Sequence, residues 1–510
     1  MSRTLPALGL LFLCAAAPAA DPKPVSYYKE VRPLFQQFCQ GCHQPAKPLG
    51  GLVMTAHAEI FKKGDSEQAA VVAGRPQDSL LVKLLVGVDG RARMPKGKDP
   101  LSDAQIKLIA TWVAQGAADD TPTSAKAPAV DADHPPAYDL PPVLTAVTFS
   151  PDGQLLAVSG YHEVLLHKAD GSGLIARLVG LSERIQSASF SPDGKTLAVS
   201  GGDPGRFGEI QLWDVAKRML RLSIPVSYDT VYGVSWSPDN KLVACGCADN
   251  TVRAFEAATG KQVVFQGAHS DWVTGTVFSQ DGHHLASISR DRSVKLTEVP
   301  TNRFMDNVTS ITPGALKGGL LAIDLRPAKD LRSEYATRIM MGAAQSTLRP
   351  DLGALKAALT PPTKRMSVVP PDAPGVPPKV YDELLVAGAD GVPRLYKMHR
   401  EAKRVIGDDF NKVREFEKFP GRIYAVAFNK KGNLFVAGSS SDGTGEARVY
   451  DTDSGKRVST FAGVTTPVYA VAFRPDSLAV ATAGFDGSVR LNDPVTGKLI
   501  KEFVPVPAKR

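Results

Sequence analysis

Most of the chain alternates short apolar runs with polar turns, a pattern typical of β-strands. The run Val147 to Phe149 is followed by the turn residues Ser150 to Gly153 and by a second apolar run, Leu155 to Val158. The Asp-Gly pair in such a turn supplies the positive backbone φ that a tight hairpin needs. This unit therefore predicts two antiparallel strands joined by a short turn.

The same unit recurs between residues 143 and 504. Its first strand carries an aromatic residue at one fixed position: Phe149, Phe190, Trp236, Phe278, Phe428 and Phe473. The first four of these residues are 41, 46 and 42 positions apart. A divergent copy begins near Leu320 and resumes at Leu384, and counting it gives seven copies. Repeats of this length predict a series of small sheets, one per repeat.

A helical pattern replaces this alternation between about residues 24 and 119. Apolar residues at Val31, Leu34, Phe35 and Phe38 predict a helix that Pro33 starts or kinks. A second helix is predicted from the capping pair Ser102 and Gln105 and from apolar residues at helical spacing. Those residues are Ile106, Ile109, Ala110 and Val113, and Gly116 is the expected stop.

The first predicted helix ends in the motif Cys39-Gln40-Gly41-Cys42-His43. The spacing Cys-x-x-Cys-His predicts covalent attachment of one c-type haem, with thioether bonds from Cys39 and Cys42. The adjacent His43 is the expected axial ligand of the haem iron. The motif thus predicts a cofactor, a redox role and an oxidising compartment outside the cytoplasm.

The sixth iron ligand must come from another part of the chain. Met94 is the best candidate, because it lies in a loop just before the last helix and Pro95 restricts its backbone to extended geometry. A thioether ligand favours ferrous iron and raises the reduction potential. Met54 and His57 are rival ligands, although both are much closer to His43 in sequence.

The features of residues 24–119 resemble known cytochromes. Two terminal helices around a Cys-x-x-Cys-His motif and a Met-Pro loop are similar to the class I cytochrome c fold. The details resemble the planctomycete-type cytochrome c domain, and they include Val31 to Phe35, Gly50 to Leu52, Val72 to Gly74 and Ser79 to Leu81. That resemblance implies a small all-α haem domain in which Met94 is the distal ligand.

The repeats resemble WD40 repeats, whose unit is one four-stranded blade of a β-propeller. The namesake dipeptide survives only at Trp213-Asp214, while Ala268-His269, Asp271-Trp272 and Asp291 match another part of the pattern. The resemblance implies an all-β propeller of seven blades. It also implies that His269 joins a structural hydrogen-bond network inside its blade.

Charge adds one expectation about partners. The formal net charge is +8, from 60 basic and 52 acidic residues, with no Lys/Arg block that would indicate nucleic acid. Four basic residues flank Met94, namely Arg91, Arg93, Lys96 and Lys98. We expect this basic collar to steer an acidic protein redox partner, unless it is ordinary loop charge.

The N-terminus predicts an export signal over residues 1–20. Arg3 precedes the apolar run Leu8 to Ala17, and Ala17-Pro18-Ala19 offers small residues for cleavage. A periplasmic or other extracytoplasmic location is therefore expected, with no membrane span in the mature chain. A retained anchor and lipidation at Cys14 are the alternatives.

The domain map that follows has four parts: residues 1–20 as signal, 21–119 as haem domain, 120–142 as a Pro/Ala-rich linker and 143–504 as propeller. A long insertion, about 328–380, interrupts the fifth repeat. Cys245 and Cys247 are expected to be small core residues. Five other histidines are expected on the surface or in loops: His162, His167, His283, His284 and His399.

The leading functional prediction is an exported electron-transfer protein whose propeller binds other proteins. No catalytic constellation stands out in the sequence. Two alternatives stay open: a periplasmic redox enzyme with chemistry on the propeller, and a scaffold that senses the redox state of the haem.

Overall fold

The structure is a computed structural model of the whole chain. It describes residues 23–44, 47–87, 93–96, 99–122, 130–310, 312, 316–327, 382–401, 403, 405, 407 and 409–507. The expected signal at 1–20 and the insertion at 328–380 lie outside these residues.

The N-terminal part is mainly helical. Its elements are a π-helix η1 (Tyr27–Val31), α1 (Arg32–Phe38), β1 (His43–Gln44), β2 (Lys47–Pro48), the 3-10 helices η2 (Leu49–Gly51), η3 (His57–Phe61) and η4 (Pro76–Asp78), α2 (Leu80–Val86) and α3 (Asp103–Ala114). The antiparallel pair of β1 and β2 departs from the expected purely α-helical domain. His43 pairs with Pro48 and Gln44 with Lys47.

One apolar core holds these helices together. Trp112 of α3 is 1% exposed, stacks on Tyr27 at 5.4 Å between ring centroids and meets Phe35 edge to face at 6.1 Å. The α3 helix begins with the expected capping box, in which Ser102 and Gln105 each satisfy a backbone N–H of the other. Gly116 follows the helix with φ +97°, a conformation that stops the helix and favours glycine.

The rest of the described chain is strand and turn. The first sheet contains β3 (Val147–Phe149), β4 (Leu155–Ser159), β5 (Tyr161–Lys168), β6 (Leu174–Phe190), β7 (Thr196–Asp203), β8 (Phe207–Asp214) and β9 (Met219–Ser227). The β6 strand is 17 residues long, and it pairs with β5 through its first half and with β7 through its second half.

Five four-stranded sheets follow, each with its strands in sequence order. They are β10 (Val231–Trp236), β11 (Leu242–Cys247), β12 (Val252–Glu256), β13 (Gln262–Gln266); β14 (Val273–Phe278), β15 (His284–Ser289), β16 (Val294–Glu298), β17 (Arg303–Asn307); β18 (Leu320–Leu325), β19 (Glu383–Gly388), β20 (Arg394–Lys397), β21 (Lys412–Glu415); β22 (Arg422–Phe428), β23 (Leu434–Ser440), β24 (Ala447–Asp451), β25 (Arg457–Thr460); and β26 (Val468–Phe473), β27 (Val480–Gly484), β28 (Val489–Asn492), β29 (Leu499–Phe503). The split repeat forms one sheet, because β18 pairs with β19.

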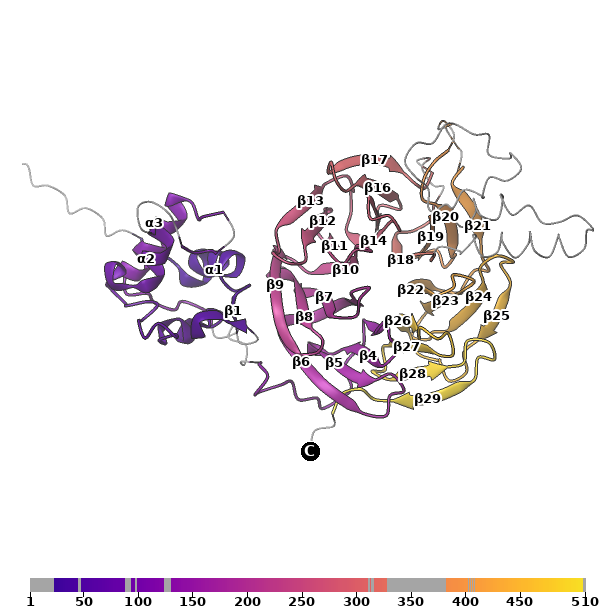
Figure 1. Cartoon of the computed structure of the whole chain (residues 1–510), viewed down its shortest axis with the longest axis horizontal. Coiled ribbons are helices and arrows are strands. Elements are labelled where there is room, and N and C mark those ends of the chain that lie inside the picture. Colours follow the sequence, from indigo (N-terminus) through magenta and orange to yellow (C-terminus); the bar gives the residue numbers. More distant parts are fainter. Residues whose placement is uncertain are drawn as a thin grey trace, which may run out of the picture.

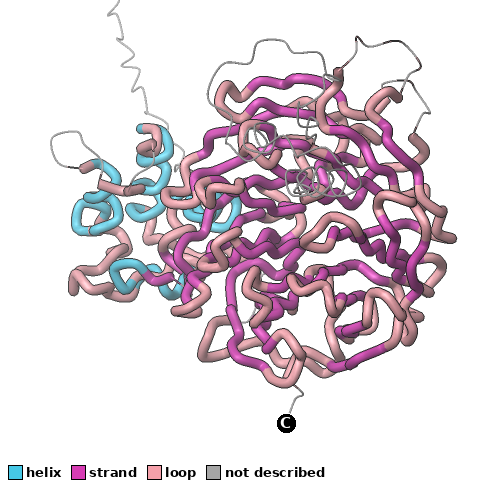
Figure 2. The backbone as a smooth tube through the Cα atoms, turned by 45° about the vertical axis from the view of Figure 1, so that its right-hand side comes forward, coloured by secondary structure: helices cyan, strands magenta, loops and turns pink. Residues whose placement is uncertain are grey.

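The sheets stand around a common centre, and the helical part lies beside the outer strand β9 (Figure 1). Apolar residues of neighbouring sheets pack face to face, and Val147 and Phe149 of β3 pack against Ala470 of β26. This contact between the first and last sheets closes the ring. In Figure 2 the helices gather on one side of the strand-rich body.

The repeated Ser-x-Asp-Gly turn has a local physical cause. Ser150 Oγ donates to Asp152 Oδ1 at 2.5 Å, and the same carboxylate oxygen accepts from the backbone N–H of Gln154 at 3.0 Å. Gly153 takes φ +71°, which residues other than glycine, asparagine and aspartate rarely adopt. The same serine–aspartate bond forms in three further turns, at Ser191, Ser237 and Ser279.

The described end of the linker is fixed to the first sheet. Tyr138 Oη donates to Glu163 Oε1 at 2.7 Å, and Arg177 forms an ion pair with the same carboxylate at 2.6 Å. Arg177 also donates to the carbonyl of Pro136 at 2.6 Å. The second half of the linker is therefore part of the propeller surface.

Candidate haem site

The haem-attachment motif forms a single turn beyond the end of α1. The N–H of Cys39 donates to the carbonyl of Phe35 at 2.9 Å, and those of Cys42 and His43 both donate to the carbonyl of Cys39 at 3.0 Å. Both cysteines are half-buried and neither forms a disulfide. The turn holds Cys39, Cys42 and His43 close together on one local framework.

Gln40 fixes this turn from inside, a role that the sequence did not indicate. Its side chain is buried, and its Nε2 donates to the carbonyl of Met54 at 2.9 Å. The N–H of Met54 donates back to the carbonyl of His43 at 2.8 Å, and Gln44 Nε2 donates to the carbonyl of Gln40 at 3.0 Å. The motif is thus tied to the segment that follows it.

His43 has one of the two properties expected of an axial ligand. Burial lowers the pKa of its imidazole, and the carbonyls of Leu49 and Leu52 offset that shift in part. Within the described residues, neither carbonyl meets hydrogen-bond geometry to His43 Nδ1, which is buried and unpaired. A neutral imidazole is the form that binds iron, and Nδ1–H of a ligating histidine usually finds such a carbonyl.

Met94 lies in the same core as the motif. It is half-buried, and it packs with Cys39 and Phe38 against the apolar cluster of the N-terminal part. The N–H groups of Arg93 and Met94 donate to the carbonyl of Leu84, at 2.9 and 3.2 Å, which anchors the loop to α2.

The rival ligands have other partners. Met54 is 1% exposed within the apolar core. His57 Nε2 lies 2.8 Å from the carbonyl of Ala117, and its ring contacts Tyr27 and Trp112 edge to face. Both positions have a structural explanation, so Met94 is the stronger candidate.

The chemistry of this donor set fits a c-type haem. Cys39 and Met94 pack against one apolar cluster, and Cys42 and the half-buried His43 lie in the same turn as Cys39. Neither cysteine forms a disulfide. The group would be held by Cys39 and Cys42 through thioether bonds and by His43 and Met94 as iron ligands. When bound, it supplies one-electron redox chemistry between ferric and ferrous iron.

Two residues of the basic collar belong to the described part of the chain, and both are exposed: Arg93 and Lys96. Arg91 and Lys98 lie outside it. These two exposed charges flank Met94 in sequence.

The haem-attachment turn also contacts the propeller. The backbone of Gly41 approaches β9 so closely that a Cβ on Gly41 would lie 2.8 Å from the carbonyl oxygen of Ser223. Tyr228 Oη donates to Gln37 Oε1 at 3.1 Å across the same interface between the helical part and the propeller, which we call the seam. Glycine at this position therefore allows the attachment turn to rest on the propeller wall.

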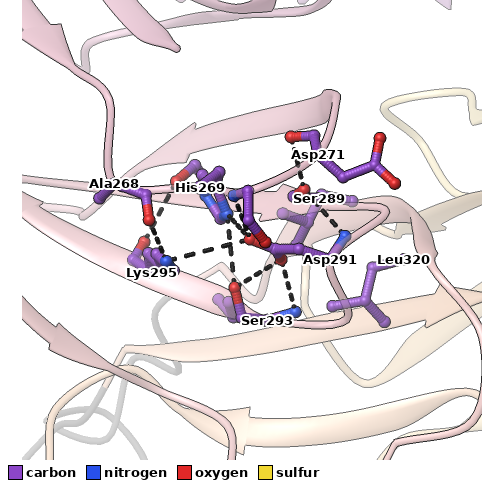
Figure 3. Close-up of polar contacts among 12 residues, drawn as sticks. Ala268, His269, Asp271, Ser289, Asp291, Ser293, Lys295 and Leu320 are labelled. Atoms are coloured by element: carbon purple, nitrogen blue, oxygen red, sulfur yellow. Dashed lines mark hydrogen bonds and ion pairs between the residues drawn. The ribbon is translucent and has the colours of Figure 1, made fainter. Parts of the chain in front are cut away.

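Inside the propeller, one polar network connects residues of a single blade. His269 Nδ1 lies 2.9 Å from Asp291 Oδ2 and Nε2 lies 2.8 Å from Ser287 Oγ, and Ser293 Oγ donates to Asp291 at 2.7 Å (Figure 3). Lys295 donates to the carbonyl of Ala268 in the same group. This confirms the expected role of His269 within its blade.

Two expectations about other side chains have different outcomes. Cys245 and Cys247 are fully buried, as expected of core residues. The expectation for His167 is wrong, because it is 4% exposed and its Nε2 lies 3.0 Å from the carbonyl of Pro505. His284 and His399, far apart in sequence, have ring centroids 4.6 Å apart. Both are half-buried, and their contact has no local signal because only the fold joins their sheets.

Comparisons with known proteins support both halves of the description. Residues 39–97 match the family Planctomycete cytochrome C. Residues 222–256, 260–297, 411–444 and 455–493 match the family WD domain, G-beta repeat. The chain joins a cytochrome-like segment to WD40 repeats. The family match at 39–97 supports haem binding.

Curated relatives match parts of the chain. One component of chromatin assembly factor 1 of Saccharomyces cerevisiae is 28% identical over 24% of this chain and 26% of its own length. Periodic tryptophan protein 2 of Arabidopsis thaliana is 29% identical over 21% of this chain and 12% of its own length. Serine-threonine kinase receptor-associated protein of Gallus gallus is 21% identical over 52% of this chain and 68% of its own length. The first two matches span about a quarter and about an eighth of those proteins.

Two kinds of feature are absent from the described residues. In the described part of the chain, no group of three or more His, Cys, Asp or Glu residues is arranged to hold a metal ion. In the same part of the chain, no helix has the length and apolar character to cross a bilayer.

Proposed function

We propose that this protein transfers single electrons through one covalent haem c held by its N-terminal part. The observation that carries the proposal is the turn in which the N–H groups of Cys42 and His43 both donate to the carbonyl of Cys39, with Met94 in the same apolar core. Filled axial positions would leave no iron site for a substrate. Electron transfer to a protein partner is then the chemistry that this arrangement supports best.

We further propose a seven-bladed propeller as the interaction platform. The strand β6 is the outer strand for β3–β5 and the inner strand for β7–β9, so the seven-stranded sheet corresponds to two blades that share it. Five four-stranded sheets complete the ring. The WD40 matches support this assignment, since one repeat is one blade.

The centre of the propeller offers a surface for other proteins. A funnel of about 920 Å³ is lined by residues that include Tyr232, Trp272 and Arg290. Tyr232 and Trp272 stack at 5.8 Å, and the Arg290 guanidinium lies 4.7 Å from the Trp272 ring centroid. Aromatic and arginine side chains dominate protein-binding hot spots, which supports a scaffold role.

Export completes the proposal. Haem attachment to paired cysteines fits a location outside the cytoplasm, and the sequence of residues 1–20 fits a cleaved signal. A periplasmic protein with an acidic redox partner is the resulting picture.

The test is expression of the full chain with haem-attachment machinery, followed by visible spectra and haem staining after denaturing electrophoresis. A c-type reduced spectrum with stain on the full-length band is expected. Covalent haem with high-spin, open iron would overturn the electron carrier in favour of catalysis or sensing. No covalent haem would overturn the haem proposal itself.

A further inference from the structure

A buried carboxyl group lies in the propeller wall beside the haem-attachment turn. Glu209 of β8 is 2% exposed. Its Oε1 accepts from Ser182 Oγ at 2.9 Å and from Gln211 Nε2 at 2.6 Å, and its Oε2 accepts from Ser223 Oγ. All three donors are neutral. Within the described residues, Glu209 has no ion-pair partner, unlike buried Glu163 with Arg177.

A small cavity connects Glu209 with the haem-attachment turn. It measures about 110 Å³ and lies in the seam between the two parts of the chain. Gln40 and Gly41 line it from the haem side, and Glu209, Ser223 and Arg206 line it from the propeller side. The cavity has room for several water molecules, and the polar side chains of Gln40, Arg206 and Glu209 would bind them, which gives the carboxyl a route for protons.

The seam also places the carboxyl close to the haem-attachment turn. Gly41 lies between Cys39 and Cys42, the two residues that would hold the haem. The same Gly41 contacts the backbone of Ser223, whose hydroxyl donates to Glu209. One residue of β9 therefore separates the attachment turn from the buried carboxyl.

We propose that Glu209 takes up one proton when the haem accepts one electron. The electron comes from a protein one-electron donor and reduces ferric to ferrous iron, while one solvent proton converts the Glu209 carboxylate to the carboxylic acid through the seam cavity. Oxidation reverses both transfers. The inference rests on the proposed haem function and adds a proton coupling to it.

The electrostatics give the sign of the coupling. Burial raises the pKa of Glu209, and the three donors offset this only in part. Loss of one positive charge at the iron raises that pKa further, because a nearby cation favours the carboxylate. Reduction therefore favours the protonated form, and the potential falls as pH rises.

Other charged groups near the seam must be counted in this balance. The carboxylate of Asp203, in β7, raises the pKa of Glu209. Arg206 lines the cavity and pairs with Asp203 at 3.6 Å. Near the seam, Arg32 of α1 interacts electrostatically with Arg206 and Asp203, and Glu183 of β6 interacts with Asp203. Tyr228, directly after β9, lines the cavity. Haem propionates would add their own dependence on pH, so only a comparison of variants isolates Glu209.

The test measures the midpoint potential of the full-length holoprotein between about pH 5 and about pH 8. One proton per electron corresponds to a fall of about 59 mV for each tenfold drop in proton concentration. We expect a falling potential in the wild type and at least half of that slope to be lost in Glu209→Gln. Glu417→Gln, a matched change at an exposed carboxylate outside the cavity lining, should keep the wild-type slope.

Ser223→Ala supplies a second, independent variant. Loss of its donated bond leaves the carboxylate less stabilised, so the pH range of the slope should move upward. Redox-difference infrared spectra should show a protonated carboxyl band in the reduced state that is absent in Glu209→Gln. Equal slopes in all variants, or no such band, would overturn the inference while a c-type spectrum still upheld the haem. Absence of covalent haem would instead be the failure of the proposed function.

Discussion

The haem part and the propeller place their important residues in opposite ways. The haem motif lies within one stretch of five residues, 39–43, and its geometry comes from a single helical turn. The network around His269 instead draws on Asp291 and Ser287, which lie 22 and 18 residues away in sequence. A local motif can therefore specify chemistry alone, whereas a repeat specifies architecture through contacts between strands.

The largest effect is expected when the thiols of Cys39 and Cys42 are removed. Cys39→Ala together with Cys42→Ala should abolish covalent haem, because no thioether can form, and haem staining should vanish. Cys245→Ala with Cys247→Ala is the matched control and should keep full staining, since both are buried in the propeller. Retained staining in the first variant would contradict the assignment of the motif.

The axial ligand tests whether one loop residue completes the local motif. Met94→Ala should lower the midpoint potential by on the order of 0.1 V, because axial ligands set haem potentials over a range of roughly 0.8 V. The weak far-red band of methionine bound to ferric iron should disappear as well. Met54→Leu and His57→Gln should leave both unchanged. A loss of the band in either control instead would transfer the ligand role.

The propeller network should respond through stability and not through the haem. His269→Ala should cost about 1–3 kcal/mol of unfolding free energy, because buried polar groups of Asp291 and Ser287 lose a partner. Scanning calorimetry at equal pH measures this, with His283→Ala, an exposed ring, as control. An unchanged visible spectrum is expected for both variants.

The same network predicts a pH dependence. Burial opposes ionisation of Asp291, but hydrogen bonds from His269 and Ser293 outweigh it and lower the pKa of its carboxyl. A carboxyl with a lowered folded pKa stabilises the protein above its unfolded pKa and loses that contribution as pH falls. Asp291→Asn should therefore flatten the acid side of the stability curve. A curve identical to that of the wild type would show that Asp291 contributes nothing there.

The smallest expected effect concerns the α3 cap. Ser102→Ala removes a side-chain bond to the N–H of Gln105 and should cost about 1 kcal/mol. Ser102→Asp keeps a capping oxygen and should retain most of that stability. Thermal unfolding followed at the haem absorbance reports on this part of the chain alone. Equal melting of the two variants would contradict the capping role.

Much of the fold and site could be predicted because the responsible signals are local. The capping pair and the turns depend on residues within a few positions of each other, and the structure contains them. The failures concern side chains joined by the fold. His167 reads as a surface residue until the C-terminal segment covers it at Pro505. Gln40 has no sequence signal, because its partner is a backbone carbonyl 14 residues away.

Spacing and periodicity along the chain were enough to predict the candidate haem chemistry, the repeated strands and the boundaries of α3, since they control covalent reach and local hydrogen bonding. They did not indicate α2. The packing of Gly41 on β9 and the position of Glu209 beside the seam became visible only in the three-dimensional structure. Gly41 and Ser223, which meet there, lie 182 positions apart in sequence. Their contact depends on how the two parts dock, a property of assembled surfaces that no local pattern encodes.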